Sequence, residues 1–385
     1  MKKEILMTPG PSQVPYRVRA AEARPAIHHR GAEFKLILAE LIACLKELLG
    51  AGNDLFILGA TGTGAMEATI VNTLSPGDRV VVYNAGKFGE RYARMNRAFG
   101  VEVVEIKKEW GEILAPDELE RTLRREKNVS AVFVTHSETS AGVVNPIAGL
   151  GEITARHDAL FIVDSVSAAG GLEIKVDDWG IDMLAGGSQK SLMTPPGLSF
   201  VTVSPRAWRA YGRAKLPRFY LDLGAYKKRL EEKGETPYTI PVSLCLALHE
   251  ALKMMKEEGF DNVFARHRRL AHACRAGVTA MGLELFSVNH SDVVTVFRVP
   301  EGIDGEKLVA AVREKHGVRV SGGQKPYRGR IVRIATMGYV TERDVLHTLC
   351  SVEMSLSELG YETAPGSAAR AAEEVFLNEK KGSDL

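Results

Sequence analysis

Cysteine is scarce in this chain, and the cysteines present lie far apart. The 385 residues contain only Cys44, Cys245, Cys274 and Cys350, and no two of them form a C-x-x-C pair. Zinc sites and disulfide frameworks need cysteines at short, regular spacings. We therefore expect reduced thiols and a cytoplasmic protein.

The chain also lacks a long apolar run. A membrane helix needs about 18–20 uninterrupted apolar residues, and the most apolar stretch here, 159–172, is interrupted by Asp164 and by several serines and glycines. At the N-terminus, Thr8-Pro9-Gly10-Pro11 follows only three apolar residues, which are too few for a signal peptide. The sequence therefore predicts no membrane span and no secretion signal.

Neither sign of charge is in excess. The chain has 50 Lys and Arg residues against 48 Asp and Glu residues, a net charge of +2. This balance gives no electrostatic reason to expect nucleic acid or an anionic membrane as a partner. The apolar share of 45% is ordinary for a globular protein and sufficient for a sizeable core. At roughly 100–200 residues per domain, the length predicts two or three domains.

Short apolar runs alternate with helical patterns through the first half of the chain. Residues 1–30 are rich in proline and arginine and predict an irregular arm, whereas 33–49 has the three- and four-residue apolar spacing of a helix. The runs that follow are nearly all apolar, which suits strands covered on both faces. Their alternation with helices predicts a mostly parallel, doubly wound sheet. The expected strands are 55–58, 80–83, 101–106, 131–135, 160–163 and 183–185.

The pattern changes after about residue 198. Residues 198–203 predict an edge strand, and the C-terminal third alternates helix and strand like a smaller α+β domain. The tail from Ala364 is expected to be mobile at its end. We divide the chain into an N-terminal arm (1–30), a large α/β domain (31–245) and a small C-terminal α+β domain (246–385).

A glycine-rich turn, Gly59-Ala60-Thr61-Gly62-Thr63-Gly64, follows the first expected strand and opens a helix. Backbone N–H groups at a helix start attract phosphate, and glycines let the anion approach. The turn lacks the lysine of a Walker loop and the glycine spacing of a dinucleotide site. Taken alone, it fits a phosphate site and an ordinary tight connection equally well.

Two charged residues stand where ligands bind in open α/β sheets. Asp164 ends an apolar strand, where a carboxylate needs a cationic partner unless it caps a helix. Lys190 lies in the loop Gly186-Gly187-Ser188-Gln189-Lys190-Ser191. A lysine held between small residues beside a sheet can have a lowered pKa and act as a nucleophile. A lysine standing alone in such a loop would be a solvated residue.

These residues belong to one expected domain and occur in a meaningful order. The phosphate loop is followed by Phe88, the stretch 136–139, Asp164 and Lys190. A pyridoxal phosphate site requires a loop for the phosphate, an aromatic ring to stack on the pyridine, an Asp beside the ring nitrogen and a Lys for the Schiff base. The residues therefore predict pyridoxal 5′-phosphate as the cofactor.

Further short motifs extend across nearly the whole chain. They are Thr8-Pro9-Gly10-Pro11, Thr61-Gly62-Thr63, Thr135-His136-Ser137-Glu138-Thr139-Ser140-Ala141-Gly142, Val163-Asp164-Ser165-Val166, Gly187-Ser188-Gln189-Lys190, Pro195-Pro196-Gly197 and Val332-Arg333-Ile334. In these motifs and their order the chain resembles the fold-type I, class V aminotransferases. The similarity is to the branch of alanine–glyoxylate, serine–glyoxylate and serine–pyruvate enzymes.

The resemblance implies roles for the central residues. Lys190 would hold the cofactor and, once released by a substrate amine, move the proton between the substrate Cα and the cofactor. Asp164 would pair with the pyridinium nitrogen. Val166 and Phe88 would cover opposite ring faces, and Thr139 would bond the ring hydroxyl.

The same resemblance implies how the two anionic groups are held. Thr61, Gly62, Thr63 and Gln189 would bind the phosphate. Arg333 would clamp the substrate α-carboxylate through its bidentate fork. The arm near Gly10 and the segment 28–30 would shape the choice of substrate.

The family resemblance also implies a homodimer with shared active sites. Thr239, in the segment 236–241, aligns with a threonine that reaches the phosphate of the partner subunit. The chain departs from the animal enzymes at Thr236, where they have Tyr, at Thr63, where they have His, and at Phe88, where they have Trp. The departures at Thr63 and Phe88 keep the chemistry possible and bear on substrate preference, and the departure at Thr236 bears on the phosphate contact between subunits.

The implied reaction is a ping-pong transfer from serine or alanine to glyoxylate or pyruvate. The same chemistry with aspartate, phosphoserine or 2-aminoethylphosphonate as donor stays open. A cysteine desulfurase is excluded because 318–324 has no cysteine. A dehydrogenase would leave Lys190 and Asp164 without a role, and a non-catalytic scaffold subunit would be expected to lack Lys190. The adjacent His28 and His29 are poorly spaced for a metal ion, so no metal is expected.

Overall fold

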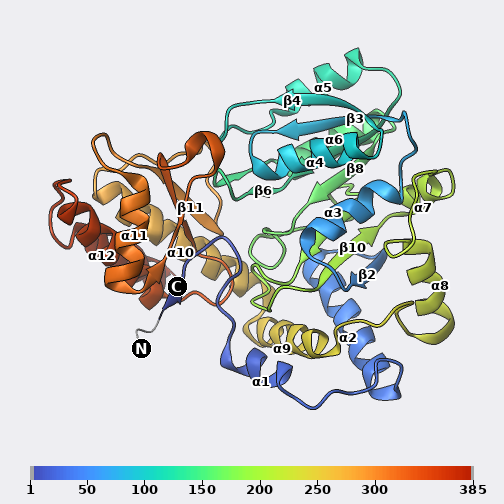
Figure 1. Ribbon diagram of the computed structural model, residues 1–385, viewed down its shortest axis with the longest axis horizontal. Helices are drawn as coiled ribbons and strands as arrows, with labels where there is room; N and C mark the ends of the chain where they lie inside the picture. Colours follow the sequence, from blue (N-terminus) through green and yellow to red (C-terminus); the bar gives the residue numbers. More distant parts are fainter. Residues whose placement is uncertain (1–3, 383–385) are drawn as a thin grey trace.

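The larger part of the molecule is built around a seven-stranded sheet (Figure 1). The computed structural model describes residues 4–382. The strand order is β2-β10-β9-β8-β5-β3-β4, and every neighbouring pair is parallel except those of β10. The predicted mostly parallel α/β sheet is therefore confirmed. The strands are β2 (Asp54–Leu58), β3 (Arg79–Asn84), β4 (Glu102–Lys107), β5 (Val129–Thr135), β8 (Leu160–Asp164), β9 (Met183–Gly187) and β10 (Ser199–Val203).

Strand β10 corrects one expectation. We predicted an edge strand at 198–203, but β10 lies inside the sheet between β2 and β9, and all of its residues are buried. The chain returns from β9 through a loop rather than a crossover helix. It therefore runs antiparallel to β9 and bonds to β2 on its other side.

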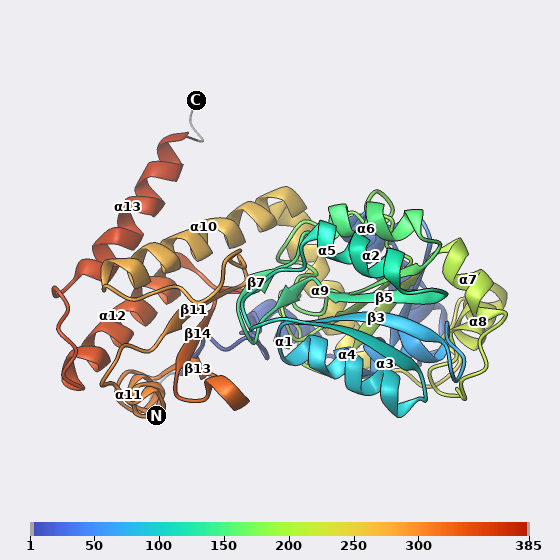
Figure 2. The ribbon, with the colours of Figure 1, turned by 90° about the horizontal axis from the view of Figure 1, so that it is seen from above.

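Helices cover both faces of this sheet, and the strands alternate between two cores. Ile57 packs with residues of α2 and α9, whereas its neighbour Phe56 packs on the opposite face with residues of α3 and α8. Figure 2 shows α2, α5 and α6 on one side of β3 and β5, and α3 and α4 on the other. These helices are α2 (Ala32–Leu49), α3 (Gly62–Val71), α4 (Lys87–Ala98), α5 (Pro116–Arg125), α6 (Ile147–Arg156), α7 (Pro205–Tyr211), α8 (Leu223–Lys233) and α9 (Val242–Glu258).

The smaller part is an α+β unit with its own core (Figure 1). Its antiparallel sheet has the order β11-β14-β13. The elements are β11 (Val294–Arg298), β13 (Ser321–Gly322), β14 (Ile331–Ala335), α10 (Phe260–Ala280), α11 (Gly305–His316) and α12 (Glu342–Glu358), with the 3-10 turn η1 (Lys325–Tyr327). The buried side chains of α9 belong to the core of the large sheet. Helix α10 connects the two parts, because its Phe264 packs in that core and its Leu270 packs in the small-domain core.

The two chain ends are more ordered than the sequence suggested. The arm contains β1 (Ile5–Leu6), which pairs with β12 (Val318–Arg319), and α1 (Tyr16–Glu22). The expected irregular arm is wrong for these two elements, because β1 is held by pairing with a strand remote in the sequence. The tail forms α13 (Ser367–Gly382), which buries Ala368, Ala372 and Phe376 against the small domain, while 383–385 lie outside the described residues. We missed this helix because its buried stripe consists mostly of alanine.

Two negative findings concern residues 4–382. No helix there is long and apolar enough to cross a membrane. No three His, Cys, Asp or Glu side chains of this part of the chain are grouped to hold a metal ion.

Candidate functional site

The expected cofactor residues collect at the carboxyl edge of the large sheet. Strands β2, β3, β5, β8 and β9 run in one direction, so the loops that follow them meet at one edge. Asp164 is the last residue of β8, and Lys190 lies three residues beyond the end of β9. This topology brings together residues that are far apart in the sequence.

Lys190 is the most enclosed amine at this edge. Its side chain is buried, and its Nζ donates a hydrogen bond to the carbonyl oxygen of Pro9. Gly10 has a φ of +96°, and a Cβ placed there would lie 2.5 Å from the Lys190 Nζ. Ser12 Oγ donates to the Lys190 carbonyl oxygen at 2.6 Å. The arm therefore covers the lysine, and a side chain at position 10 would have to displace it.

Asp164 and Lys190 perturb one another through a shared buried environment. Burial raises the pKa of Asp164 to about 6, the nearby Glu138 charge acts in the same direction, and Lys190 opposes both. Burial lowers the pKa of Lys190 to about 8, and the Asp164 charge opposes this shift. A lysine with such a pKa has a neutral, nucleophilic fraction near neutral pH.

Two side chains stand where the ring faces of a cofactor would be covered. Val166 donates its backbone N–H to Asp164 Oδ1 at 2.9 Å. A Cβ on Gly62 would lie 2.6 Å from Val166 Cγ2, so the phosphate loop and Val166 are in close contact. The Phe88 ring lies at the start of α4, with its centroid 5.9 Å from Lys190 Nζ. Phe88 thus lies near the lysine, and Val166 lies against Asp164 and the phosphate loop.

The loop before α3 offers the features that a phosphate needs. Thr61 occupies the N-cap of α3 but makes no capping hydrogen bond through its side chain. The first N–H groups of this helix therefore stay available to an anion. Gln189 adds a buried Oε1 that has no hydrogen-bond partner among the described residues. If this amide is rotated, its NH₂ group takes the place of Oε1 and can donate to an anion. The free N–H groups at the start of α3 and the Gln189 amide therefore fit a bound phosphate.

Arg333 on β14 reaches the same site from the small domain. Its side chain is buried, and burial lowers its pKa to about 10. Nε donates to the Gly322 carbonyl oxygen at 3.0 Å, and Nη1 donates to the Thr139 carbonyl oxygen at 3.4 Å. No carboxylate within 4–382 forms an ion pair with it, so the guanidinium can bind a substrate carboxylate.

Thr239 is the one predicted cofactor residue that the structure leaves outside this group. It is exposed and lies in the segment after α8, close to Gly59 at the end of β2. The rings of Phe219 and Tyr220 lie 5.8 and 5.2 Å from the ring of Tyr238 in the same region.

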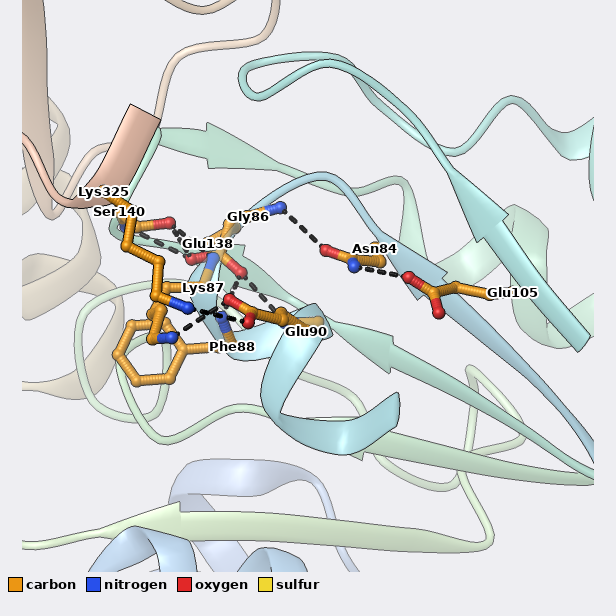
Figure 3. A network of polar contacts seen from close by, with 10 residues as sticks. Asn84, Gly86, Lys87, Phe88, Glu90, Glu105, Glu138, Ser140 and Lys325 are labelled. Atoms are coloured by element: carbon orange, nitrogen blue, oxygen red, sulfur yellow. Dashed lines mark hydrogen bonds and ion pairs between the residues drawn. The ribbon is translucent and has the colours of Figure 1, made fainter. Parts of the chain in front are cut away.

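Two charged residues of the site had no role in the sequence analysis. Arg91 donates to Thr63 Oγ1 at 2.8 Å, and its guanidinium lies 4.8 Å from the Phe88 ring centroid. Glu138 is buried beneath the start of α4 (Figure 3). Arg91 follows Phe88 by three positions on a helix start, and Glu138 stands in a stretch of small polar residues. Each of these two patterns in the sequence could have indicated that the residue belongs to the site.

Known proteins are similar to this chain over nearly its whole length. The model of the family "Aminotransferase class-V" matches residues 12–347. The chain is 36% identical to the L-aspartate–glyoxylate aminotransferase of Paracoccus denitrificans over 379 residues, which cover 96% of both chains. It is 36% identical to the serine–glyoxylate aminotransferase of Methylorubrum extorquens over 380 residues, which cover 95% of this chain and 94% of the relative.

Two further similarities complete the comparison. A protein named soluble hydrogenase 42 kDa subunit, from Anabaena cylindrica, is 42% identical over 382 residues, which cover 98% of this chain and 99% of the relative. The crystal structure of ureidoglycine–glyoxylate aminotransferase from Bacillus subtilis superposes with a TM-score of 0.93 at 32% identity and covers 98% of both chains. Three of these four names give the substrates of the enzyme, and all three include glyoxylate.

Proposed function

This chain belongs to the class V aminotransferases and is a transaminase, and we propose that it uses pyridoxal 5′-phosphate to transfer an amino group from serine or alanine to glyoxylate or pyruvate. The family implies this cofactor. The observation that carries the proposal is the buried amine of Lys190 beside the buried carboxylate of Asp164 at the carboxyl edge of the sheet.

The bound cofactor supplies an electron sink for the substrate Cα. Lys190 holds the cofactor through its amine and, when free, carries the proton to and from the substrate Cα. Asp164 keeps the ring nitrogen protonated, and its raised pKa falls when a cationic partner is present. Phe88 and Val166 exclude water from the two ring faces, and Thr139 binds the ring hydroxyl.

The remaining residues bind the two anionic ends. Thr61, Gly62, Thr63 and Gln189 hold the phosphate at the start of α3. Arg333 holds the α-carboxylate, which a donor amino acid and an acceptor 2-oxo acid have in common. Because one clamp serves both half-reactions, a single site supports the ping-pong sequence.

Small donors are favoured by the position of the arm. Pro9 and Gly10 lie directly against the Lys190 side chain, which leaves little room for a large substituent on the substrate Cα. The shared word glyoxylate in the relatives' names supports a glyoxylate acceptor. Aspartate, phosphoserine and 2-aminoethylphosphonate stay as alternative donors.

We further propose a cytoplasmic homodimer with shared active sites. Thr239 would contact the phosphate bound by the partner subunit. The supporting observation is the exposed aromatic surface beside it, where the Phe219 side chain is 79% exposed. Sedimentation of the wild type and of Phe219→Asp tests the dimer, and a wild-type monomer would refute it.

A half-reaction screen tests the proposed chemistry. The protein is loaded with pyridoxal 5′-phosphate and mixed with serine, alanine, aspartate, phosphoserine or 2-aminoethylphosphonate, one at a time, while the visible absorbance is followed. Fast conversion by serine or alanine supports the proposal, and conversion by the acidic donors alone selects the alternative. A protein that forms no visible band would favour the non-catalytic scaffold, and a visible band without conversion by any of the five donors would refute the proposed donors.

A further inference from the structure

Glu138 is a buried carboxylate without a cationic side chain bonded to it. It lies on β6 (Ser137–Glu138), which pairs with β7 (Val143–Val144), and it is 3% exposed. No Lys, Arg or His side chain within 4–382 forms an ion pair with it. Glutamate is almost never buried to this degree without a partner, so its position needs an explanation.

Four hydrogen bonds replace the missing ion pair (Figure 3). Glu138 Oε2 accepts from the backbone N–H groups of Phe88 at 2.8 Å and Gly89 at 3.1 Å. Oε1 accepts from the N–H of Ser140 at 3.2 Å and from Ser140 Oγ at 2.5 Å. Ser140 Oγ itself accepts from the Lys87 N–H at 2.9 Å, so its hydrogen is free for Glu138.

This pattern favours the ionised form of the carboxylate. Three of the four partners are backbone N–H groups, which can only donate. A protonated carboxyl could donate only to Ser140 Oγ, with the serine hydrogen turned away, whereas the ionised form accepts from all four partners. Burial raises the pKa of Glu138, and the four donors oppose that shift. The start of α4 also favours a negative charge through the helix dipole.

The carboxylate determines where α4 begins. A Cβ on Gly86 would lie 2.3 Å from the Cδ and Cγ atoms of Glu138, so the chain before α4 is wrapped closely around the side chain. Phe88 and Gly89, the two residues bonded to Oε2, lie in the first turn of that helix. The ring of Phe88 is therefore fixed relative to Lys190 by a contact made through its own backbone.

Glu138 is also next in the chain to Thr139, whose carbonyl oxygen accepts from Arg333 Nη1 at 3.4 Å. Its negative charge acts on Asp164 of β8, on Lys190 after β9 and on Arg333 of β14. Arg91 of α4 is the other charge that acts on Asp164 and Lys190. The negative charge of Glu138 opposes the effect of Arg91 and Arg333 on the pKa of Lys190, and it raises the pKa of Arg333.

We propose that Glu138 is a positioning residue of the cofactor site: as a carboxylate it holds the start of α4, and with it the Phe88 ring, and it counterbalances the cations around Lys190. The proposal rests on the proposed pyridoxal phosphate site. A simple structural cap of α4 would have the same hydrogen bonds but no effect on the charges of the site, and this difference can be measured.

Glu138→Gln is the informative variant, because it keeps the shape and removes the charge. Either orientation of the amide points its NH₂ group at a backbone donor. Glu138→Asp keeps the charge with a shorter reach, and it serves if the Gln variant does not fold.

The chain provides a matched control in Glu353 on α12. This buried carboxylate accepts from the N–H groups of Gly366 at 2.8 Å and Ala368 at 3.2 Å and from Ser367 Oγ at 2.9 Å. It therefore binds the start of α13 as Glu138 binds the start of α4, but it lies in the small-domain unit. Glu353→Gln tests the loss of a buried helix-capping charge alone.

Three quantities are measured for each variant: the unfolding midpoint, the dissociation constant of pyridoxal 5′-phosphate, and the pH midpoint of the visible band of the loaded protein. We expect Glu138→Gln and Glu353→Gln to lose similar stability. Only Glu138→Gln should weaken cofactor binding, by about tenfold. Only this variant should also move the pH midpoint of the band to lower pH, because the loss of a negative charge disfavours the protonated nitrogen at Lys190. Glu138→Asp should keep the wild-type midpoint.

A Glu138→Gln protein with the wild-type midpoint and wild-type cofactor affinity overturns the proposal and leaves a structural cap. If the wild type forms no visible band, the proposed function fails, and Glu138 is then judged on the cofactor-free protein. There the pH dependence of Lys190 acetylation, read by mass spectrometry, gives the pKa of its amine. A lowered pKa in Glu138→Gln supports the charge effect, and an unchanged pKa refutes it.

Discussion

Replacing Gly10 by alanine tests the contact between the arm and Lys190. Gly10 has a φ of +96°, and a Cβ there would lie 2.5 Å from both Cδ and Nζ of Lys190. The left-handed backbone costs a non-glycine residue about 1–2 kcal/mol. Carbon atoms in contact prefer about 3.5–4.0 Å, so the lysine must also move by about 1 Å.

The backbone strain should affect the free energy of unfolding, and the displacement of Lys190 should affect turnover. The flexible end of the lysine can move aside, so the free energy of unfolding should fall only by the backbone strain, about 1–2 kcal/mol. A displacement of about 1 Å at a reacting group costs about 100-fold in turnover. We therefore expect Gly10→Ala to be folded, slightly destabilised and about 100-fold slower.

Gly77→Ala is the matched control. Gly77 has a φ of +82°, and a Cβ there would meet no atom within 4 Å, so the variant carries the strain without the contact. Denaturant unfolding of the cofactor-free proteins and steady-state transamination of the loaded proteins compare the two. Wild-type turnover in Gly10→Ala would refute the argument, as would an equal loss of turnover in Gly77→Ala.

Three further predictions concern the charged residues of the site. Lys190→Ala should abolish transamination and leave the circular dichroism spectrum unchanged; measurable turnover above background would remove the lysine from the mechanism. Arg333→Ala should lower kcat/KM about 10- to 100-fold for every carboxylate substrate alike, because it loses hydrogen bonds to a charged group, and an effect limited to one substrate would contradict an α-carboxylate clamp. The pKa of Lys190 is lowered to about 8 in the folded chain, so between about pH 8 and 10 the unfolded state binds more protons and stability rises with pH. The unfolding free energy of the cofactor-free wild type should therefore rise relative to Lys190→Met over this window, and a constant difference would show that the folded lysine titrates normally.

Much of the fold follows from local patterns. The helix expected at 33–49 matches α2 (Ala32–Leu49) to within one residue, and each expected strand of the large domain overlaps an observed one. Apolar periodicity reports these elements because each strand is covered on both faces and each helix on one. The order of motifs then places Asp164 and Lys190 at the same edge, because parallel strands have their carboxyl ends in common.

The pairing of segments that are far apart in the sequence could not be predicted from local patterns. The inner position of β10 depends on its bonds to β2, and β1 is a strand only because β12 lies beside it. Helix α13 depends on the surface to which it binds, since its alanine stripe is only weakly apolar by itself. Each of these elements is stabilised by a partner remote in the sequence.

The sequence by itself determined the class of chemistry, because the types and order of a few residues limit what a site can do. The inference rested on the order of the short motifs that contain Lys190, Asp164 and Arg333, and on the family that they resemble. Only the tertiary structure decided how these residues are held. Gly10 is confined by the Lys190 side chain, and Glu138 binds the backbone of Phe88 at 2.8 Å. The physical reason is that hydrogen bonding, burial and pKa depend on distances between atoms, and those distances are set by the packing of the whole domain.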